Sequence, residues 1–370
     1  MFVRVDLPAD PAIRRILVIK WSAMGDVMIA TALFEDIARA FEGREIHLNT
    51  LPAWEKLFAG DTRFQRVFAI DLRDASRPLA AVREWLRLVR RERYDLIIDL
   101  QSNDRSRLLV TLLRLSGARI PYRVGINRRW PYNIVPETNF PRSTPILTRM
   151  RAALNAGGIA TATGRPVLSI PESHAVRARQ LLAAHGAKPG DYAVFLPGCS
   201  AGGQLKRWGF ERYAALAERL HQEGLDRIVL IGGPDEIEEC RRIAERCGPW
   251  LVNLCGQTAI LDIPPLCASA RCIVANDTGT AHLAAVTPTP MTVICGPTDP
   301  VRVKPLGDNV TALQAALPCV NCYRKTCSHH SCMKMITPAQ VLQQLQQRAR
   351  PADPNGVASD QGFSASTEGA

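Results

Sequence analysis

The sequence predicts an α/β protein of two domains whose parallel β-sheets face each other across a central cleft. Apolar runs at residues 16–19, 192–196 and 272–275 can form buried strands, and each precedes a turn and a helix-forming segment. Strands that alternate with helices favour parallel sheets with right-handed crossovers. The chain has 370 residues, which is enough for two domains of usual size.

The first half is predicted to begin with a strand, a turn at residues 21–26 and a helix over 27–40. The further elements expected there are a strand at 46–49, an amphipathic helix around 79–91, a strand at 94–100, a helix from about 108 and a strand at 124–126. Arg83, Arg87, Arg90 and Arg91 cover the polar faces of the amphipathic helix and favour a solvated basic surface.

Sequence containing Pro and Gly between residues 157 and 171 is expected to link the halves. The second half then repeats the layout, with helices at 171–185, 210–223, up to 247 and 338–350, and strands at 192–196, 227–231, 272–275 and 291–295. We therefore expect an N-terminal domain over 1–170 and a C-terminal domain over 171–350, whose last helix could pack back on the first domain. Residues 351–370, rich in Gly, Ser and Asp, are expected to be a disordered tail.

Composition is that of a soluble globular protein, with 46% hydrophobic and 22% charged residues. No uncharged apolar run approaches the roughly 20 residues that cross a bilayer. The first 20 residues lack a signal-peptide core, so we expect a cytoplasmic protein.

The net charge of +11 lies almost entirely in the first half. Residues 1–170 hold 27 Lys and Arg against 17 Asp and Glu, a net of +10, whereas residues 171–370 hold 19 against 18, a net of +1. The first half is therefore the candidate for an acidic partner, and nucleic acid, anionic lipid and phosphorylated saccharide all fit.

The turn after the first strand contains Gly25 and Asp26. The other glycines of the dinucleotide fingerprint G-x-G-x-x-G are missing, which disfavours NAD. A carboxylate at the carboxyl end of a strand can take a proton from an attacking hydroxyl. The same residue could equally be the N-cap of the following helix, and its position alone favours the cap.

Turns in the second half suit a diphosphate ligand. Residues 276–282 combine side-chain oxygens, Gly279 and His282 at the start of a helix, where backbone N–H groups favour an anion. A second turn at 296–300 should lie beside it, and Lys206 follows a small-residue loop at 197–203. Glu236 could accept hydrogen bonds from ribose hydroxyls or could be a solvated helix residue.

Four of these segments together resemble the heptosyltransferase family of bacterial glycosyltransferases, family 9. They are residues 16–26, with Lys20 and Met24-Gly25-Asp26; residues 196–208, with Lys206 and Trp208; Asn276-Asp277-Thr278-Gly279-Thr280-Ala281-His282, similar to D-[ST]-G-x-x-H; and Gly296-Pro297-Thr298-Asp299-Pro300. The resemblance covers roughly residues 14–345, and four motifs in order make chance agreement improbable.

The resemblance implies a GT-B architecture and inverting transfer of a sugar from a nucleotide diphosphate sugar. In the family the donor is usually ADP-heptose, and the acceptor is the inner core of lipopolysaccharide. The implied site residues are Asp26 as general base with Lys20 beside it; Lys206, Thr278, Gly279 and Thr280 at the phosphates; Glu236 at the ribose; and Asp277 and His282 on the donor side. Candidates for the anionic acceptor are Arg63, Arg105, Arg107 and Arg123. The chemistry needs no cofactor, no nucleic acid is expected as a partner, and contact with the cytoplasmic face of the inner membrane fits a glycolipid acceptor.

A cysteine-rich loop is not explained by the resemblance. Cys319, Cys322, Cys327 and Cys332 follow a C-x2-C-x4-C-x4-C spacing, with His329 and His330 between the last two. Four thiolates so close in sequence could close a tetrahedral, structural zinc site. The other interpretation is a loop of reduced or partly oxidised cysteines.

Two other functions remain open at this point. A zinc-bearing nucleic-acid-binding protein would use the basic half and the cysteine loop, but aromatic residues are only 6% and no nucleic-acid motif is present. A catalytically silent GT-B binding module is the other, and the presence of Asp26, Lys206 and His282 argues against it.

Overall fold

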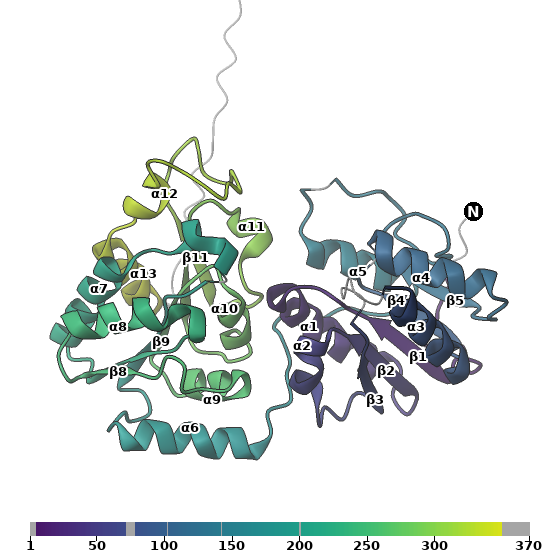
Figure 1. Cartoon of the computed structure of the whole chain (residues 1–370), viewed down its shortest axis with the longest axis horizontal. Coiled ribbons are helices and arrows are strands. Elements are labelled where there is room, and N and C mark those ends of the chain that lie inside the picture. Colours follow the sequence, from purple (N-terminus) through teal and green to yellow (C-terminus); the bar gives the residue numbers. More distant parts are fainter. Residues whose placement is uncertain (1–4, 72–77, 102, 142, 200, 350–370) are drawn as a thin grey trace, which may run out of the picture.

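The computed structural model describes residues 5–71, 78–101, 103–141, 143–199 and 201–349, which form two α/β halves that lie side by side (Figure 1). The tail expected to be disordered lies outside the described residues. Each half has a wholly parallel sheet with helices on both faces, so the predicted fold class is confirmed.

The first half contains a five-stranded sheet with the order β3-β2-β1-β4-β5 among the described residues. Its strands are β1 (Arg15–Ile19), β2 (Glu45–Thr50), β3 (Arg66–Ala69), β4 (Leu96–Asp99) and β5 (Tyr122–Gly125). Its helices are α1 (Met24–Ala40), α2 (Pro52–Glu55), α3 (Pro78–Glu92), α4 (Asp104–Leu115) and α5 (Ile146–Ala156).

The second half contains a six-stranded sheet with the order β11-β10-β9-β6-β7-β8 in the same described part of the chain. Its strands are β6 (Tyr192–Leu196), β7 (Arg227–Leu230), β8 (Leu251–Asn253), β9 (Cys272–Asn276), β10 (Met291–Cys295) and β11 (Val310–Gln314). Its helices are α6 (Glu172–Ala184), α7 (Phe210–Gln222), α8 (Ile237–Arg246), α9 (Ile263–Ala268), α10 (Gly279–Ala284), α11 (Pro300–Val303), α12 (Ser331–Lys334) and α13 (Pro338–Ala349). Short 3-10 turns cover Lys56–Phe58, Ala201–Lys206, Pro234–Glu236 and Ile260–Asp262.

The strand order places the predicted site turns where the order of the strands reverses in each sheet. In each sheet the chain order reverses between two neighbouring central strands, β1 and β4 in the first half and β6 and β9 in the second. Ligands of open α/β sheets bind outside the carboxyl ends of the strands at such reversal points. The turns after β1, β6 and β9, which carry Asp26, Lys206 and Asp277, therefore occupy the positions where this fold usually binds a ligand.

Helix α1 joins the two halves. Its residues from Val27 to Phe34 are buried, because one side packs on the first sheet and another packs on α10 of the second half. Leu33 and Phe34 of α1 belong to the same hydrophobic core as Ala281 and Leu283 of α10. A helix that is apolar on most sides is expected to be buried on most sides, and here it is buried between two domains.

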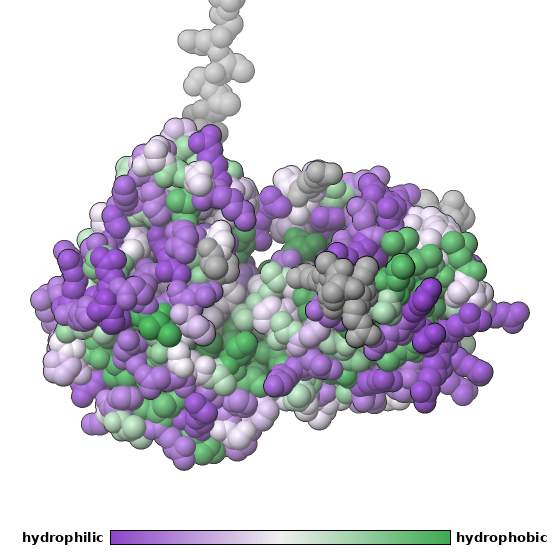
Figure 2. Space-filling model, viewed as in Figure 1, coloured by the Kyte–Doolittle hydropathy of each residue, from purple (hydrophilic) through white to green (hydrophobic). Residues whose placement is uncertain are grey.

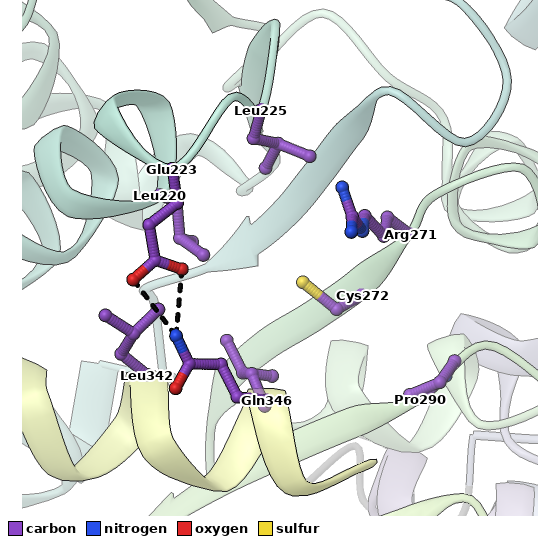
Figure 3. Close-up of a pocket in the computed structure, with 9 residues that line it drawn as sticks. Leu220, Glu223, Leu225, Arg271, Cys272, Pro290, Leu342 and Gln346 are labelled. Atoms are coloured by element: carbon purple, nitrogen blue, oxygen red, sulfur yellow. Dashed lines mark hydrogen bonds between the residues drawn. The ribbon is translucent and has the colours of Figure 1, made fainter. Parts of the chain in front are cut away.

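Among the described residues, helix α13 packs on the second half and not on the first, although the sequence allowed packing on the first. It contacts α7 and β10 of the second half, and Val341, Leu342 and Leu345 enter that half's core. Gln346 Nε2 donates hydrogen bonds of 3.0 Å to both carboxylate oxygens of Glu223 at the end of α7 (Figure 3). The apolar face of α13 is therefore used entirely within the C-terminal half.

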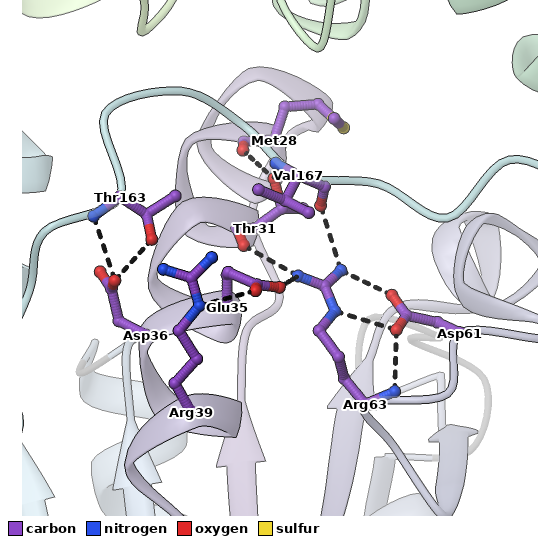
Figure 4. A network of polar contacts seen from close by, with 9 residues as sticks. All are labelled: Met28, Thr31, Glu35, Asp36, Arg39, Asp61, Arg63, Thr163 and Val167. Carbon is purple, nitrogen blue, oxygen red and sulfur yellow. Dashed lines mark hydrogen bonds and ion pairs between the residues drawn. The ribbon is translucent and has the colours of Figure 1, made fainter. Parts of the chain in front are cut away.

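The segment that links the halves is tied to α1. Asp36 Oδ1 accepts hydrogen bonds from Thr163 N, at 3.1 Å, and from Thr163 Oγ1, while Val167 N donates to Thr31 Oγ1 at 3.0 Å (Figure 4). Arg63 completes this network: its guanidinium pairs with Asp61 at 2.6 Å and donates to the carbonyl oxygen of Val167 at 3.0 Å. The linker thus runs along the helix whose first turn carries Asp26.

Candidate active site

The first turns of α1 and α10 are in direct contact across the junction of the halves. A Cβ atom added to Gly25 would lie 2.9 Å from both Cδ2 and Nε2 of the His282 imidazole. A Cβ added to Gly279 would lie 3.0 Å from Cβ of Met24. Because only glycine fits both positions without displacement, the two turns approach as closely as their backbones allow.

Asp26 lies in the first turn of α1 and is half-buried. The alternative in which Asp26 caps the helix is wrong, since the N-cap residue is Ala23 and no side chain caps the helix. The carboxylate therefore remains available for another role. The unpaired N–H groups of a helix start favour negative charge at this position.

Lys20 follows β1 and is only 1% exposed. Burial lowers its pKa, and the nearby carboxylates of Asp26 and Asp99 oppose that shift. Its Nζ lies 3.4 Å from the carbonyl oxygen of Leu100. Lys20 is thus a buried lysine close to the carboxylates of Asp26 and Asp99.

Lys206 and Asp277 bring three turns of the second half together. Lys206 Nζ lies 2.7 Å from Asp277 Oδ2, and Thr298 Oγ1 donates to the same oxygen at 2.9 Å. Asp277 follows β9, Lys206 follows β6 and Thr298 follows β10. The predicted adjacency of the turns at 276–282 and 296–300 is therefore present.

His282 connects this ion pair to Asp26. Burial lowers the pKa of His282, while the carboxylates of Asp277 and Asp26 raise it and the Lys206 cation lowers it further. All three charged groups therefore lie within electrostatic range of one imidazole. The junction combines a carboxylate of the first half with a Lys, an Asp and a buried His of the second.

Asn276 is a residue whose role the sequence did not reveal. Its side-chain amide donates to the carbonyl oxygens of Pro197 and Gly198, and its Oδ1 accepts from Trp208 N and from Tyr213 OH, at 3.3 and 3.1 Å. It thereby fixes the loop that contains Lys206 to the end of β9. An Asn placed directly before the conspicuous Asp277 was the only signal for this role.

The comparisons with known proteins identify the family. The model of glycosyltransferase family 9 (heptosyltransferase) matches residues 82–333, which is more than half of the chain. The chain belongs to glycosyltransferase family 9. The resemblance seen in the sequence motifs is confirmed, and the chain is a glycosyltransferase.

Relatives of the family 9 chain match over nearly its whole length. Lipopolysaccharide heptosyltransferase 1 of Pseudomonas aeruginosa is 28% identical over 328 residues, which cover 85% of this chain and 88% of that protein. A family 9 glycosyltransferase structure from Veillonella parvula has a TM-score of 0.78 at 19% identity and covers 90% of this chain and 97% of that one. The Escherichia coli heptosyltransferase WaaC with ADP has a TM-score of 0.68 at 23% identity, covering 90% and 100%. These structures establish the GT-B fold; the comparisons do not support the nucleic-acid-binding or catalytically silent alternatives.

The remaining residues predicted for the donor side lie in or beside the turns after β7 and β9. Thr278 is the N-cap residue of α10, and Thr280 Oγ1 lies 3.4 Å from Thr278 Oγ1. Glu236 folds back on its own turn, where its Oε2 accepts a 2.5 Å hydrogen bond from Gly233 N. Its side chain also presses on Gly198, whose added Cβ would lie 2.0 Å from Glu236 Cγ. Glu236 therefore contacts both the turn after β6 and the turn after β7.

Two of the four expected acceptor arginines have structural partners instead. Arg63 is held in the network that anchors the linker. Arg123 is buried, its Nε donates to the carbonyl oxygen of Pro131 at 2.7 Å, and burial lowers its pKa. Sequence alone cannot tell a guanidinium that satisfies backbone carbonyls from one that awaits a ligand.

Arg105 and Arg107 fit the expectation better. They lie in the first turn of α4, directly after β4, which is the strand beside β1. Arg105 is exposed, and Arg107 pairs with the exposed Asp104 at 3.0 Å. Both therefore lie at the same sheet edge as Asp26.

The surface is hollowed between the two halves on the face seen in Figure 2. A cavity of about 490 Å³ lies at the junction, lined by Ile29 of α1, by residues 145–148 before and within α5 and by residues 300–308 around α11. A cleft between the halves is thus present beside α1. No helix within the described ranges is long and apolar enough to cross a membrane.

Proposed function

We propose that this family 9 enzyme transfers a heptose, with inversion, from ADP-heptose to the core saccharide of lipopolysaccharide. The observation that carries the proposal is the approach of Asp26 to the cluster of Lys206, Asp277 and His282 across the junction of the halves. The names of the relatives and the ADP-bound structural neighbour support the choice of donor and acceptor.

In the proposed mechanism Asp26 acts as the general base. It accepts the proton of an acceptor hydroxyl while that oxygen forms a bond to the anomeric carbon of the donor sugar. The bond from the same carbon to the diphosphate oxygen breaks, and its electron pair leaves with the nucleotide diphosphate. Attack from the face opposite the leaving group inverts the configuration at that carbon.

Lys206 is the proposed counter-charge for the leaving diphosphate. Its ammonium group is paired with Asp277, which also accepts a hydrogen bond from Thr298. A bound diphosphate would share the Lys206 ammonium with Asp277 or would replace Asp277 as its partner. The negative charge that grows on the leaving group would then be stabilised by a cation that is already in position. The hydroxyl groups of Thr278 and Thr280 are the proposed hydrogen-bond donors to the same phosphates, with Gly279 leaving room for their approach.

Three further residues have proposed roles on the donor and acceptor sides. Glu236 keeps its predicted role at the ribose, for which the carboxylate oxygen not used by Gly233 remains. Arg105 and Arg107 are proposed to bind anionic groups of the acceptor, because they lie at the sheet edge that carries Asp26.

We propose that the enzyme works at the cytoplasmic face of the inner membrane. A glycolipid acceptor is anchored there, and the exposed arginines Arg83, Arg87, Arg90 and Arg91 of α3 suit an anionic lipid surface. Co-sedimentation with phosphatidylglycerol vesicles that weakens with salt would support this. Equal sedimentation of the R87E/R91E variant would assign the binding to another surface.

A calorimetric panel of nucleotide sugars tests the donor assignment. ADP-heptose and ADP should bind, and UDP- and GDP-sugars should bind at least about tenfold more weakly. A pocket that hydrogen-bonds adenine would leave its polar groups without partners when another base is bound, and this cost discriminates strongly. Binding of a UDP- or GDP-sugar in preference to ADP-heptose would overturn the choice of donor.

A further inference from the structure

The cysteine-rich loop runs from Pro318, after β11, to Cys332 in α12, and lies outside the proposed catalytic machinery. Its four thiols, Cys319, Cys322, Cys327 and Cys332, line one pocket of about 180 Å³ together with the imidazoles of His329 and His330. Cys319 and Cys322 are exposed, Cys327 is half-buried and Cys332 is buried. The topology thus brings six side chains of metal-ligand type to one small concave surface.

We propose that the four thiolates bind one zinc ion, and that the closed site fixes the position of two turns of the donor site. Within the described residues no three of these side chains already stand in metal-binding geometry. Binding therefore requires the exposed part of the loop, Cys319 to Cys322, to close on the half-buried Cys327 and the buried Cys332.

The backbone of the loop contains several left-handed residues. Among non-glycine residues of the described chain, four have a left-handed φ, and three of them lie here: Asn321 at 59°, Tyr323 at 52° and His330 at 49°. L-residues rarely adopt this conformation. The His330 backbone N–H points at Cys327 Sγ, with an N–S distance of 3.4 Å, which is a contact that suits a thiolate ligand.

The charges of the loop favour a thiolate metal centre over a site for Mg²⁺ or Ca²⁺. Residues 315–335 contain no Asp or Glu, so the oxygen ligands that those ions need are missing. A zinc ion with four thiolates carries a net charge of −2. Arg324, Lys325 and Lys334 in the same stretch supply cations to offset it.

Contacts link the loop to both sides of the Lys206–Asp277 pair. His330 Nε2 lies 2.7 Å from the carbonyl oxygen of Leu205, the residue before Lys206. Tyr323 N donates to the carbonyl oxygen of Pro297 at 2.8 Å, next to Thr298, which holds Asp277. The contact with Leu205 uses the imidazole of His330, so we assign the four cysteines as the zinc ligands. His330 is then a positioning residue.

The test uses the full-length protein purified without chelator, and compares C322S with C247S, a control cysteine that ends α8 and does not line the pocket of the loop. We expect close to one zinc per chain in the wild type and in C247S, and less than half of that in C322S. Cobalt substitution should give a thiolate-to-cobalt charge-transfer band that is present in the wild type and weakened in C322S. Loss of zinc should also weaken ADP binding severalfold while circular dichroism stays unchanged.

Two results would overturn the proposal. One is a zinc content near zero in the wild type together with no charge-transfer band on adding cobalt. The other is zinc at the loop with ADP affinity equal in the wild type and C322S, which removes the link to the donor turns. Metal content is measured without any sugar donor, so failure of the proposed function would leave the zinc result intact and the two failures are distinguishable.

Discussion

The imidazole of His282 lies against the backbone of Gly25, at 2.9 Å from the place where a Cβ atom of residue 25 would stand. This contact joins the turn that presents Asp26 to the helix that follows Asp277. A side chain at residue 25 would therefore hinder the approach of the two halves.

Replacing Gly25 with Ala should disturb this junction. Ala is the better helix former, so the helix alone would gain stability. The new methyl group collides with a buried ring, however, and overpacking of this kind costs roughly 1–3 kcal/mol. We expect G25A to lower both the free energy of unfolding and the turnover rate.

The controls for that substitution are G164A and the double variant G25A/H282A. No atom lies within 4 Å of an added Cβ at Gly164, so G164A should be nearly neutral. Removing the ring should recover part of the loss, as contacting residues show non-additive effects. Additive losses in the double variant would mean that the Gly25–His282 contact is not the cause.

The buried imidazole of His282 makes stability depend on pH. Its pKa in the folded protein is lowered from the ordinary 6.5 by burial. Below about pH 6.5 the imidazole of the unfolded chain takes up a proton, whereas the buried imidazole of the folded chain does not yet do so. The contribution of His282 to the free energy of unfolding is therefore complete above that pH and is lost as the pH falls towards the lowered pKa of the folded protein.

Urea unfolding of the wild type and H282Q from pH 5 to 8 measures this effect. The difference between the two proteins should shrink as the pH falls. His47 also has a pKa lowered by burial and contributes to the wild-type slope, so only the difference isolates His282. A difference that is constant with pH would contradict the assignment.

Lys206 should contribute directly to nucleotide binding. A charged hydrogen bond is worth about 1.5–3 kcal/mol, which corresponds to about ten- to hundredfold in affinity. We expect K206A to lose ADP affinity by such a factor in calorimetry, whereas K188A, at an exposed lysine of the same domain, should bind as the wild type does. Equal ADP affinity for K206A and K188A would rule out Lys206 as the phosphate ligand.

Arg63 should matter for stability rather than for the acceptor. Its loss leaves the carboxylate of Asp61, 2% exposed, and the Val167 carbonyl without their partner. Breaking a buried pair in this way costs about 3 kcal/mol. R66A removes an exposed pair with Glu92 and should cost under about 1 kcal/mol. Chemical denaturation compares the stability of the two variants. If R63A is as stable as R66A but has a raised KM for the acceptor, Arg63 binds the acceptor as the sequence suggested.

The sequence was informative about the backbone framework of the site. Continuous apolar runs marked the central strands, and parallel strands place their following turns at one sheet edge, so Asp26, Lys206 and Asp277 could be expected there. The start of α1 was less predictable. The search for a capping side chain pointed to Asp26, but α1 begins at Met24 without one because packing against Gly279 and α10 holds its first turn.

Tertiary partners explain what the sequence did not predict. Arg63 and Arg123 have the same side chain as Arg105, and only the folded chain shows that backbone carbonyl groups use the first two. The apolar face of α13 fits either half by composition, and its contacts with α7 and β10 decide the matter. Asn276 acts through four backbone and side-chain groups that come together only when β6 and β9 pair.

The most direct test of the mechanism separates catalysis from donor binding in D26N, which keeps the shape of residue 26 but not its charge. Sugar transfer is followed with ADP-heptose and a lipopolysaccharide core acceptor, and ADP affinity is measured by calorimetry on the same protein. We predict that turnover falls by at least about a hundredfold, the range in which a general base acts, while ADP affinity stays within about twofold of the wild type. Turnover close to that of the wild type would contradict the assignment of Asp26 as the base.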